Sequence, residues 1–347
     1  MVRTQKITIK DVAKAAGVST QTVSRVINLR PDVSTETKER VLKVIEELGF
    51  SPNVIARSLV RGRSNTLGVV GYGLGYFGPT NTLKGIEQKS TELGFSLILS
   101  LMDDFEPSHI DALANNLLSR QVDGIIWAVP GNDRMIGQLS SRFRHISVPV
   151  VYLNKAKRAN DVIVALENNY GAQLATEHLL NQGYDTVGII TGPSDWWEAQ
   201  RREAGWREVM HERGFGNLDA LKVAGGWSAH DGEAGLRELL KKSPHIDAVF
   251  ASNDQMALGA LKAAREMGIQ VPEQLGIVGF DDIPEAEYFY PTLTTIRQNA
   301  KALGAMAVDQ MCSIIRAWRK GEEYATDVIW IKPRLIIRNS SIREANG

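Results

Sequence analysis

The sequence is poor in cysteine. Cys312 is the single cysteine in 347 residues, so the chain cannot close an internal disulfide or build a cysteine cage for zinc. It lies in an apolar helical pattern, where a buried and unreactive thiol is expected. We therefore expect no disulfide, no metal site, no redox chemistry and no cofactor.

Long apolar runs are also absent. No segment approaches the roughly 18 uninterrupted apolar residues of a membrane helix, and the start, MVRTQKITIKD, lacks the apolar stretch of a secretion signal. With 43% hydrophobic and 23% charged residues, the composition excludes disordered, collagen-like and coiled-coil proteins. We expect a cytoplasmic protein with two or three domains.

Catalytic signatures are missing as well. The six histidines are scattered, and the sequence has no H-E-x-x-H, G-x-S-x-G or P-loop pattern. The adjacent carboxylates Asp281 and Asp282 are compatible with general acid–base work, but loop capping explains them equally well. We expect the protein not to be an enzyme.

The total charge is zero, but it is unevenly distributed. Residues 1–63 contain twelve basic and six acidic residues, a net charge of +6, so the remainder carries −6. Phosphate neutralisation dominates nucleic-acid affinity, and the basic part is therefore predicted to meet a polyanion. A merely solvated basic face is the alternative.

The first fifty residues predict three short helices. Residues 9–16 form a helical repeat that Gly17 stops, Ser19 caps a second helix ending near Asn28, and Ser34 or Thr35 begins a third. Two short helices joined by a tight glycine turn form a helix-turn-helix. The apolar positions that define the helices are Ile9, Val12, Ala13 and Ala16, then Val23, Val26 and Ile27, then Val41, Leu42, Ile45 and Leu48, with Gly49 at the end.

The second of these helices exposes side chains that suit base recognition. Residues near the N-terminus of such a helix reach base edges in the major groove. Gln21 can bond to adenine and Arg25 to guanine, each giving roughly 1 to 3 kcal/mol of discrimination. Helix-turn-helix geometry also occurs in proteins that never touch DNA, but the basic charge favours DNA binding.

From Leu67 onward, short apolar runs alternate with amphipathic segments. This pattern predicts parallel sheets covered on both faces, and about ten strands are more than one small doubly wound sheet needs. Two sheets with a ligand cleft beyond the carboxyl ends of their strands are the economical arrangement. The expected strands are 67–70, 95–101, 124–128, 149–153, 162–166, 187–190, 248–251 and 275–280, and the expected helices include 83–93, 171–182, 198–213, 255–267 and 300–318.

The stretch ITIKDVAKAAGVSTQTVSRVIN resembles the DNA-binding headpiece of the LacI/GalR (lactose-repressor) family. Further similarity lies in FSPNVIARSL, NDQMALGAL, LGIVGFDDI and YPTLTTI, so the resemblance spans nearly the whole chain. It implies an all-α headpiece and an α/β core of two doubly wound, periplasmic-binding-protein-like subdomains. It also implies base contacts at Thr20, Gln21 and Arg25, and phosphate contacts at Thr8, Ser19, Thr22, Ser24, Asn28 and Ser34.

The expected domain boundaries follow from this comparison. The headpiece covers 1–50, a hinge helix and linker cover 51–64, the core covers 65–340, and a tail covers 341–347. The first subdomain of the core takes 65–164 and 298–327, and the second takes 165–297 and 328–340.

The segment 52–59 has physical features of a conditional helix. Pro52 suits a first helical turn, but a helix of about eight residues is unstable alone in water. In the family this hinge helix folds on the operator as a dimer and inserts a leucine into the minor groove, which implies Leu59 as the wedge and Asn53, Ala56 and Arg57 as hinge residues. Alternatively, Leu59 simply ends a linker.

A glycine-rich loop follows the first apolar run. Gly73, Gly75 and Gly78 match the dinucleotide fingerprint G-x-G-x-x-G. Bulky residues at 76 and 77, Pro79, and the lack of an acidic residue at the expected distance argue against nicotinamide binding. An aromatic rim of a ligand cleft is the preferred interpretation, with Tyr72 and Phe77 among its residues.

Several tryptophans fall where a cleft ligand would lie. Trp127, Trp196 and Trp227 lie at strand ends or in the following loops, and aromatic rings stack on the C–H faces of sugars; a core role for any one of them is the alternative. The resemblance implies effector contacts at Arg202, Asn253 and Asp281. Asn154 stands where some relatives have aspartate, which leaves the ligand open.

Together these features predict a ligand-regulated repressor of sugar-utilisation genes that binds a palindromic DNA operator and is released by a mono- or disaccharide. The chain ends without a leucine heptad tail, so we expect a homodimer. The alternatives are a regulator that needs a non-sugar metabolite as corepressor, a periplasmic sugar-binding protein, which would need an export signal, and a dehydrogenase.

Overall fold

The computed structural model describes residues 7–28, 30–50, 63–102, 107–129 and 146–343. Contacts divide the chain into two compact units that meet between Ser64 and Asn65. The expected hinge residues Asn53, Ala56, Arg57 and Leu59 lie outside the described residues. Within the described part, no helix is both long and apolar enough to cross a membrane.

The N-terminal unit contains three short helices, α1 (Ile9–Ala16), α2 (Thr20–Ile27) and α3 (Thr35–Glu47). Gly17 ends α1 with a φ of 64°, a left-handed conformation that glycine adopts without steric cost. The Ser19 and Ser34 hydroxyls accept hydrogen bonds from the backbone N–H groups of Thr22 and Thr37, at 3.1 and 3.4 Å. The local capping residues thus begin and end the helices as predicted.

One small core holds these helices together. Its buried side chains are Val12, Ala13, Ala16, Val23, Val26 and Val41. Leu42, which we expected on the apolar face of the third helix, is 44% exposed. The reason is geometric: Val41 already occupies the narrow apolar stripe of α3, and its neighbour Leu42 points about 100° away from it.

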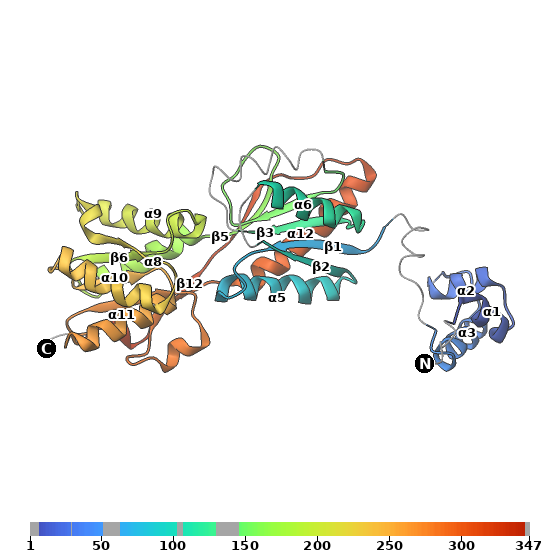
Figure 1. Cartoon of the computed structure of the whole chain (residues 1–347), viewed down its shortest axis with the longest axis horizontal. Helices are drawn as coiled ribbons and strands as arrows, with labels where there is room; N and C mark the ends of the chain where they lie inside the picture. The colour runs from blue at the N-terminus through green and yellow to red at the C-terminus, as the bar shows by residue number, and fades with distance from the viewer. Residues whose placement is uncertain (1–6, 29, 51–62, 103–106, 130–145, 344–347) are drawn as a thin grey trace. The chain divides into compact units, whose positions relative to one another are not determined.

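The second unit contains two six-stranded sheets, and Figure 1 shows how helices cover them. The first has the order β11-β5-β4-β3-β1-β2 and is parallel throughout. Its strands are β1 (Thr66–Gly71), β2 (Ser96–Leu101), β3 (Gly124–Ala128), β4 (Val150–Leu153), β5 (Val162–Leu166) and β11 (Val328–Ile331). Helices α5 (Phe77–Glu92) and α12 (Ala300–Lys320) cover one face and α6 (Pro107–Ser119) the other.

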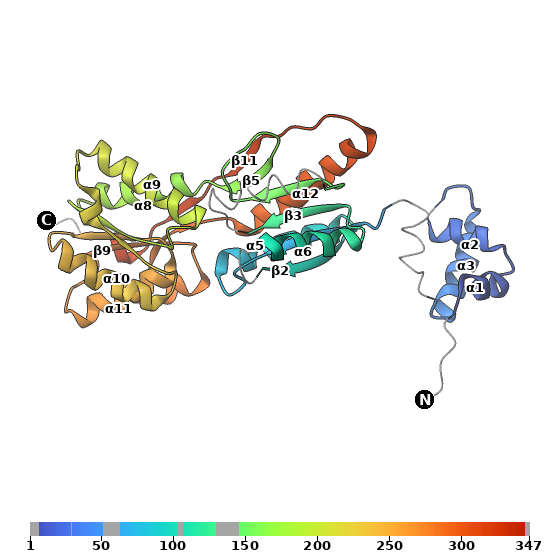
Figure 2. The same cartoon turned by 45° about the horizontal axis from the view of Figure 1, so that its top comes forward.

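The second sheet has the order β12-β10-β9-β8-β6-β7, and only β12 runs antiparallel to its neighbour. Its strands are β6 (Val187–Thr191), β7 (Lys222–Ala224), β8 (Ala248–Ala251), β9 (Gly276–Phe280), β10 (Thr294–Arg297) and β12 (Arg334–Ile336). As Figure 2 shows, α8 (Asn168–Asn181) and α9 (Trp197–Glu212) lie on one face, and α10 (Ala229–Lys242) and α11 (Asp254–Glu266) on the other. Short 3-10 turns occupy Leu218–Leu221, Pro284–Tyr288 and Asn339–Ser341.

The C-terminal boundary of the subdomains differs from the expectation. We assigned all of 328–340 to the second subdomain, but β11 pairs with β5 in the first sheet, with Val328 opposite Ile163. The chain therefore reaches the second sheet only after Ile331, at β12. The edge of β5 can pair with one more parallel strand. Which sheet edge a short strand joins depends on the tertiary structure, and the pattern of apolar residues does not predict it.

Candidate functional site

The exposed face of α2 carries the predicted base-reading residues of the N-terminal unit. Thr20, Gln21 and Arg25 are exposed, while Val23 and Val26 are buried against the other helices. Arg25 forms an ion pair with Asp32, with Nη1 and Oδ2 3.5 Å apart and both side chains about half exposed. Such a surface pair is weak, so the guanidinium can exchange it for another acceptor.

Three of the six predicted phosphate-binding residues, Thr8, Ser19 and Ser34, are N-caps of helices. Ser19 and Ser34 are N-caps of α2 and α3, and the Thr8 hydroxyl, just before α1, donates to the Asp11 carboxylate at 2.7 Å. Helix N-termini attract phosphate because their free N–H groups and their dipole favour an anion. Thr22, Ser24 and Asn28 are half-buried along α2; the Asn28 amide donates to the Ser24 hydroxyl at 3.3 Å.

A cleft in the second unit has about 940 Å³ of space free of protein atoms, part of which is open to solvent. It is lined from both sheets by residues that directly follow parallel strands: Tyr72 after β1, Asn154 after β4, Asn253 close after β8, and Asp281 after β9. This is the position at which open α/β sheets bind ligands. Lining residues that we predicted are Tyr72, Phe77, Asn154, Trp196, Arg202, Trp227, Asn253 and Asp281.

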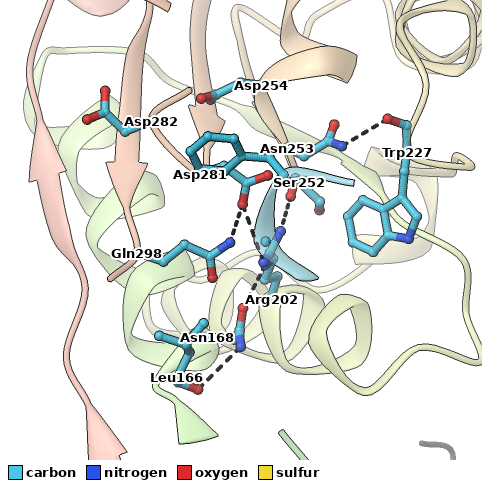
Figure 3. Close-up of polar contacts among 12 residues, drawn as sticks. Leu166, Asn168, Arg202, Trp227, Ser252, Asn253, Asp254, Asp281, Asp282 and Gln298 are labelled. Atoms are coloured by element: carbon cyan, nitrogen blue, oxygen red, sulfur yellow. Dashed lines mark hydrogen bonds and ion pairs between the residues drawn. The ribbon is translucent and has the colours of Figure 1, made fainter. Parts of the chain in front are cut away.

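Arg202 lies at the centre of the polar side of the cleft (Figure 3). It is only 4% exposed. Its Nε donates to Asn168 Oδ1 at 2.8 Å, its Nη1 donates to the carbonyl of Ser252, and its Nη2 lies 3.8 Å from Asp281 Oδ1. The guanidinium also lies over the Phe280 ring, 3.8 Å from the centroid. These contacts hold the planar group in one orientation.

Asp281 faces Arg202 from the loop after β9. Its carboxylate accepts a hydrogen bond from the Gln298 side chain, and its backbone N–H donates to the carbonyl of Ile296 at 2.8 Å. Burial raises the pKa of Asp281 to about 6, although Arg202 and Gln298 both lower it. The buried carboxylate is thus costly to keep charged, and a hydrogen-bond donor from a ligand would relieve that cost.

The neighbouring Asp282 points elsewhere. Its carboxylate pairs with Arg297 and, at 2.8 Å, with Arg338 Nη2, and it does not line the cleft. Of the two readings that the sequence left open for this acidic pair, the structure favours loop anchoring for Asp282. Asp281 remains the cleft carboxylate.

Three predicted lining residues have positive φ angles, which residues other than glycine rarely adopt. The φ values are 46° for Asn154, 77° for Trp227 and 121° for Asp281. Asn253 helps to hold this geometry, because its Nδ2 donates to the Trp227 carbonyl at 2.9 Å while its Oδ1 accepts from Met256 N–H at 2.8 Å. Such strained positions concentrate where a fold builds a binding site.

Aromatic rings form the other side of the cleft. Trp196 contacts Tyr72, Tyr76 and Trp227, with ring centroids 5.8, 5.6 and 5.7 Å apart. The tyrosines belong to the glycine-rich loop after β1 and the tryptophans to loops of the second sheet. The loop that resembled a dinucleotide fingerprint thus supplies Tyr76 and Phe77 to the cleft wall, in agreement with the aromatic-rim interpretation.

Trp127 does not join this wall. It is 2% exposed and packs in the core beneath α6, together with Leu117 and Ile125. The next residue along β3, Ala128, lines the cleft instead. Trp127 was expected at the cleft because it lies near a strand end, but the alternation of side chains along the strand turns it into the core.

Sequence reasoning missed several lining residues. Glu198 in the first turn of α9 and Gln298 after β10 both line the cleft, and Asn168 supports Arg202 from α8. Asp254, the first residue of α11, is buried and accepts hydrogen bonds from Ile283 N–H and Thr295 Oγ1, at 2.8 and 2.5 Å. The signal that could have identified Gln298 is its position directly after a strand. That strand, β10, was not among those expected from the sequence, so the signal was missed.

Comparisons with known proteins agree with both units. Residues 8–53 match the family model "Bacterial regulatory proteins, lacI family", and residues 176–341 match "Periplasmic binding protein-like domain". The chain is 33% identical to the HTH-type transcriptional repressor PurR of Edwardsiella ictaluri over 337 residues, 96% of each chain. It is 31% identical to the lactose operon repressor of Escherichia coli, over 89% of this chain and 84% of the relative.

Solved structures give the same result. A lac repressor dimer bound to operator and the anti-inducer ONPF matches with a TM-score of 0.88 and 28% identity, covering 98% of this chain and all of that one. The transcriptional regulator CelR in complex with cellobiose matches with a TM-score of 0.69 and 29% identity, covering 96% and 99%. The predicted fold class is confirmed, and the chain belongs to the lacI family of bacterial regulatory proteins as one of its transcriptional repressors.

Proposed function

We propose that this repressor controls carbohydrate-utilisation genes and leaves a pseudo-palindromic operator when a small sugar fills the cleft. The observation that carries the proposal is the composition of the cleft: flat aromatic rings on one side and a fixed Arg202–Asp281–Gln298 cluster on the other. Sugars need both, since their C–H faces stack on rings while their hydroxyls require donors and acceptors.

The comparisons support a sugar effector without naming it. A neighbour structure holds cellobiose, and relatives include lactose and ribose operon repressors. The same comparisons include PurR repressors of similar identity, and a flat purine would also stack on Trp196. A corepressor of that kind, which would strengthen operator binding, is the second candidate.

For DNA binding, we propose that Thr20, Gln21 and Arg25 of each copy contact bases in one half-site. The Leu59 side chains of the two copies would insert into the minor groove between the half-sites. Two copies of the chain would bind two half-sites related by a two-fold axis, because protein symmetry is mirrored in the operator. Ligand binding in the cleft would then change operator affinity through a difference in ligand affinity between the DNA-bound and free states.

Two measurements on the full chain test this function. Selection from random duplexes should return an inverted repeat, and a thermal-shift screen of monosaccharides, disaccharides and purine bases should identify the effector class. A sugar that raises the melting temperature should weaken operator binding by roughly 5- to 150-fold, the usual range of allosteric coupling.

The variant Asp281→Ala separates the two roles. It should lose the sugar-induced melting shift while retaining the selected operator, because Asp281 lies in a different unit from α2. Recovery of no preferred duplex would exclude sequence-specific repression. A response confined to purine bases, with tighter operator binding, would replace the sugar by the corepressor alternative.

A further inference from the structure

We propose that Glu198 selects the charge of the effector: it restricts the cleft to uncharged or cationic polyhydroxyl ligands and rejects phosphorylated and acidic sugars. This inference rests on the proposed sugar effector and deepens it by naming the ligand class and the residue that decides it. Glu198 is the second residue of α9 and lines the cleft near Arg202.

The first argument is the balance of charge. Among the described residues that line the cleft, the ionisable acidic and basic side chains are Glu198, Arg202 and Asp281. The only cation of the three already faces Asp281 at 3.8 Å and donates to Asn168 and Ser252. A ligand anion would therefore meet two carboxyl groups and an arginine whose charge is already shared.

The behaviour of the carboxyl groups points the same way. Burial raises the pKa of Glu198 against the opposing effects of Arg202 and Asn154, and burial also raises that of Asp281. Two negative charges are thus already disfavoured at this place, and a phosphate or carboxylate on the ligand would add a third.

The second argument is hydrogen-bond complementarity. Glu198 Oε2 and Gln298 Oε1 are buried and have no hydrogen-bond partner in the described part of the chain, and the same holds for Trp227 Nε1. The two oxygens call for donors and the indole N–H for an acceptor. A hydroxyl group supplies both, and an ammonium group supplies donors, whereas an ionised phosphate or carboxylate offers only acceptors.

Glu198 also stands where the two halves of the cleft meet. Asn154, which follows β4 of the first sheet, lines the cleft with Glu198, which belongs to α9 of the second half, and Asn154 is one of the groups that lower the pKa of Glu198 against the effect of burial. A ligand group held by Glu198 would therefore lie at the boundary between the two halves. Glu198 would thus select the charge of the ligand at a position that a ligand bound between the two halves must contact.

The experiment compares matched ligand pairs by isothermal titration of the full chain. The pairs are glucose with glucose 6-phosphate, glucuronate and glucosamine; ribose with ribose 5-phosphate; cellobiose with cellobiose 6-phosphate; and lactose with lactose 6-phosphate. Any neutral sugar that binds should bind at least about 10-fold more tightly than its anionic counterpart, since one lost charge-assisted hydrogen bond has an effect of that order. Glucosamine should bind no more weakly than glucose.

Glu198→Gln keeps the size of the side chain and removes its charge. It should weaken binding of the neutral sugar about 10-fold and reduce the ratio between the affinities for the neutral sugar and its anionic counterpart. It should not lower the melting temperature of the ligand-free protein. Glu212→Gln, at the exposed far end of the same helix, is the matched control and should leave both affinities unchanged.

The outcomes separate this inference from the proposed function. Equal or tighter binding of an anionic sugar by the unmodified chain overturns the role of Glu198 but leaves a sugar effector in place. So does a neutral-to-anionic ratio that Glu198→Gln leaves unchanged. Absence of binding by every sugar in the set overturns the sugar effector, and the charge selection with it.

Discussion

A single buried arginine organises the polar half of the cleft. Arg202 has partners on α8, in the loop after β8 and in the loop after β9. It therefore connects three segments of the half that contains the second sheet. Removing one partner of such a buried pair leaves an uncompensated charge. The residue is therefore a structural support of the cleft as well as a candidate ligand contact.

The buried carboxyl of Asp281 predicts a pH-dependent stability. Its folded-state pKa of about 6 lies above its ordinary value of 3.8, so the folded protein binds more protons than the unfolded chain between these values. Stability from this group should therefore fall as pH rises from about 4 to about 6, by roughly 2 to 3 kcal/mol, and then level off. Asp281→Asn should remove that slope.

Urea unfolding at pH 4.5, 5.5 and 7.5 measures this prediction as the difference between the parent protein and the variant. Asp327→Asn is the control, because the Asp327 side chain is 82% exposed, and it should leave the slope unchanged. A difference between parent and Asp281→Asn that does not vary with pH would show that Asp281 is not protonated in the folded state.

The Arg25 side chain makes a prediction about operator sequence. Its ion pair with Asp32 is on the surface and contributes little to folding, so Arg25→Ala should leave the melting temperature unchanged. It should relax preference at one operator position, with a loss of roughly 1 to 3 kcal/mol for the favoured base. Binding-site selection with the variant measures this, and Lys43→Ala on α3 should retain the parental preference.

At the scale of elements, glycines set how closely the helices pack. In each helix pair that covers a sheet face, a glycine meets the backbone of the partner helix. A Cβ added at Gly85 would lie 2.1 Å from the Lys301 carbonyl oxygen, one at Gly205 would lie 2.2 Å from that of Asn169, and one at Gly259 would lie 1.8 Å from that of Ala229. These contacts join α5 to α12, α8 to α9 and α10 to α11.

Gly259→Ala should consequently separate α10 from α11 and destabilise the protein by roughly 1 to 3 kcal/mol or more, since overpacking against backbone cannot be relieved by a rotamer change. Thermal unfolding measures the effect. Gly216→Ala is the control, because an added Cβ there meets nothing within 4 Å. Equal melting temperatures for the two variants would mean that the helices can move apart at no cost.

The elements also show where sequence patterns stop being informative. The eight expected strands are present with shifts of one residue at most, because each is a run of mostly apolar residues. All of them except β2, which has exposed positions, are buried along most of their length. β7, β10, β11 and β12 were not individually predicted. They are three or four residues long, and β11 and β12 contain exposed positions, so they form strands because a neighbouring edge pairs with them.

At the scale of the whole molecule, the polypeptide of the second unit passes three times from one sheet to the other. The passages follow β5, β10 and β11. Trp197, on α9, packs in the core of the first sheet and stacks on Trp330 of β11, with ring centroids 6.3 Å apart and planes inclined by 17°. The two halves are thus linked beside the cleft.

The residues that we propose for operator binding and for ligand binding lie in separate units, which predicts that mutation can separate the two activities. Leu59→Ala should weaken operator binding and reduce DNA bending, because a leucine wedge unstacks one base step. The sugar-induced melting shift should remain, since the described residues that line the cleft all belong to the second unit. Anisotropy and a bending assay measure the first two effects; unaltered bending would remove Leu59 from the minor groove.

The order of amino acids was enough to predict the three N-terminal helices, the alternation of strands and helices, and most of the aromatic and polar residues of the cleft. These depend on local capping, on burial of periodic apolar residues and on a family resemblance that is spread along the chain. The packing of the folded chain was needed to establish that Trp127 faces the core, that Asp282 pairs with arginines, and that Glu198 and Gln298 line the cleft with Asp281. Those outcomes depend on which strand edges pair and which side of each strand end faces the cleft, and residues distant in the chain settle both.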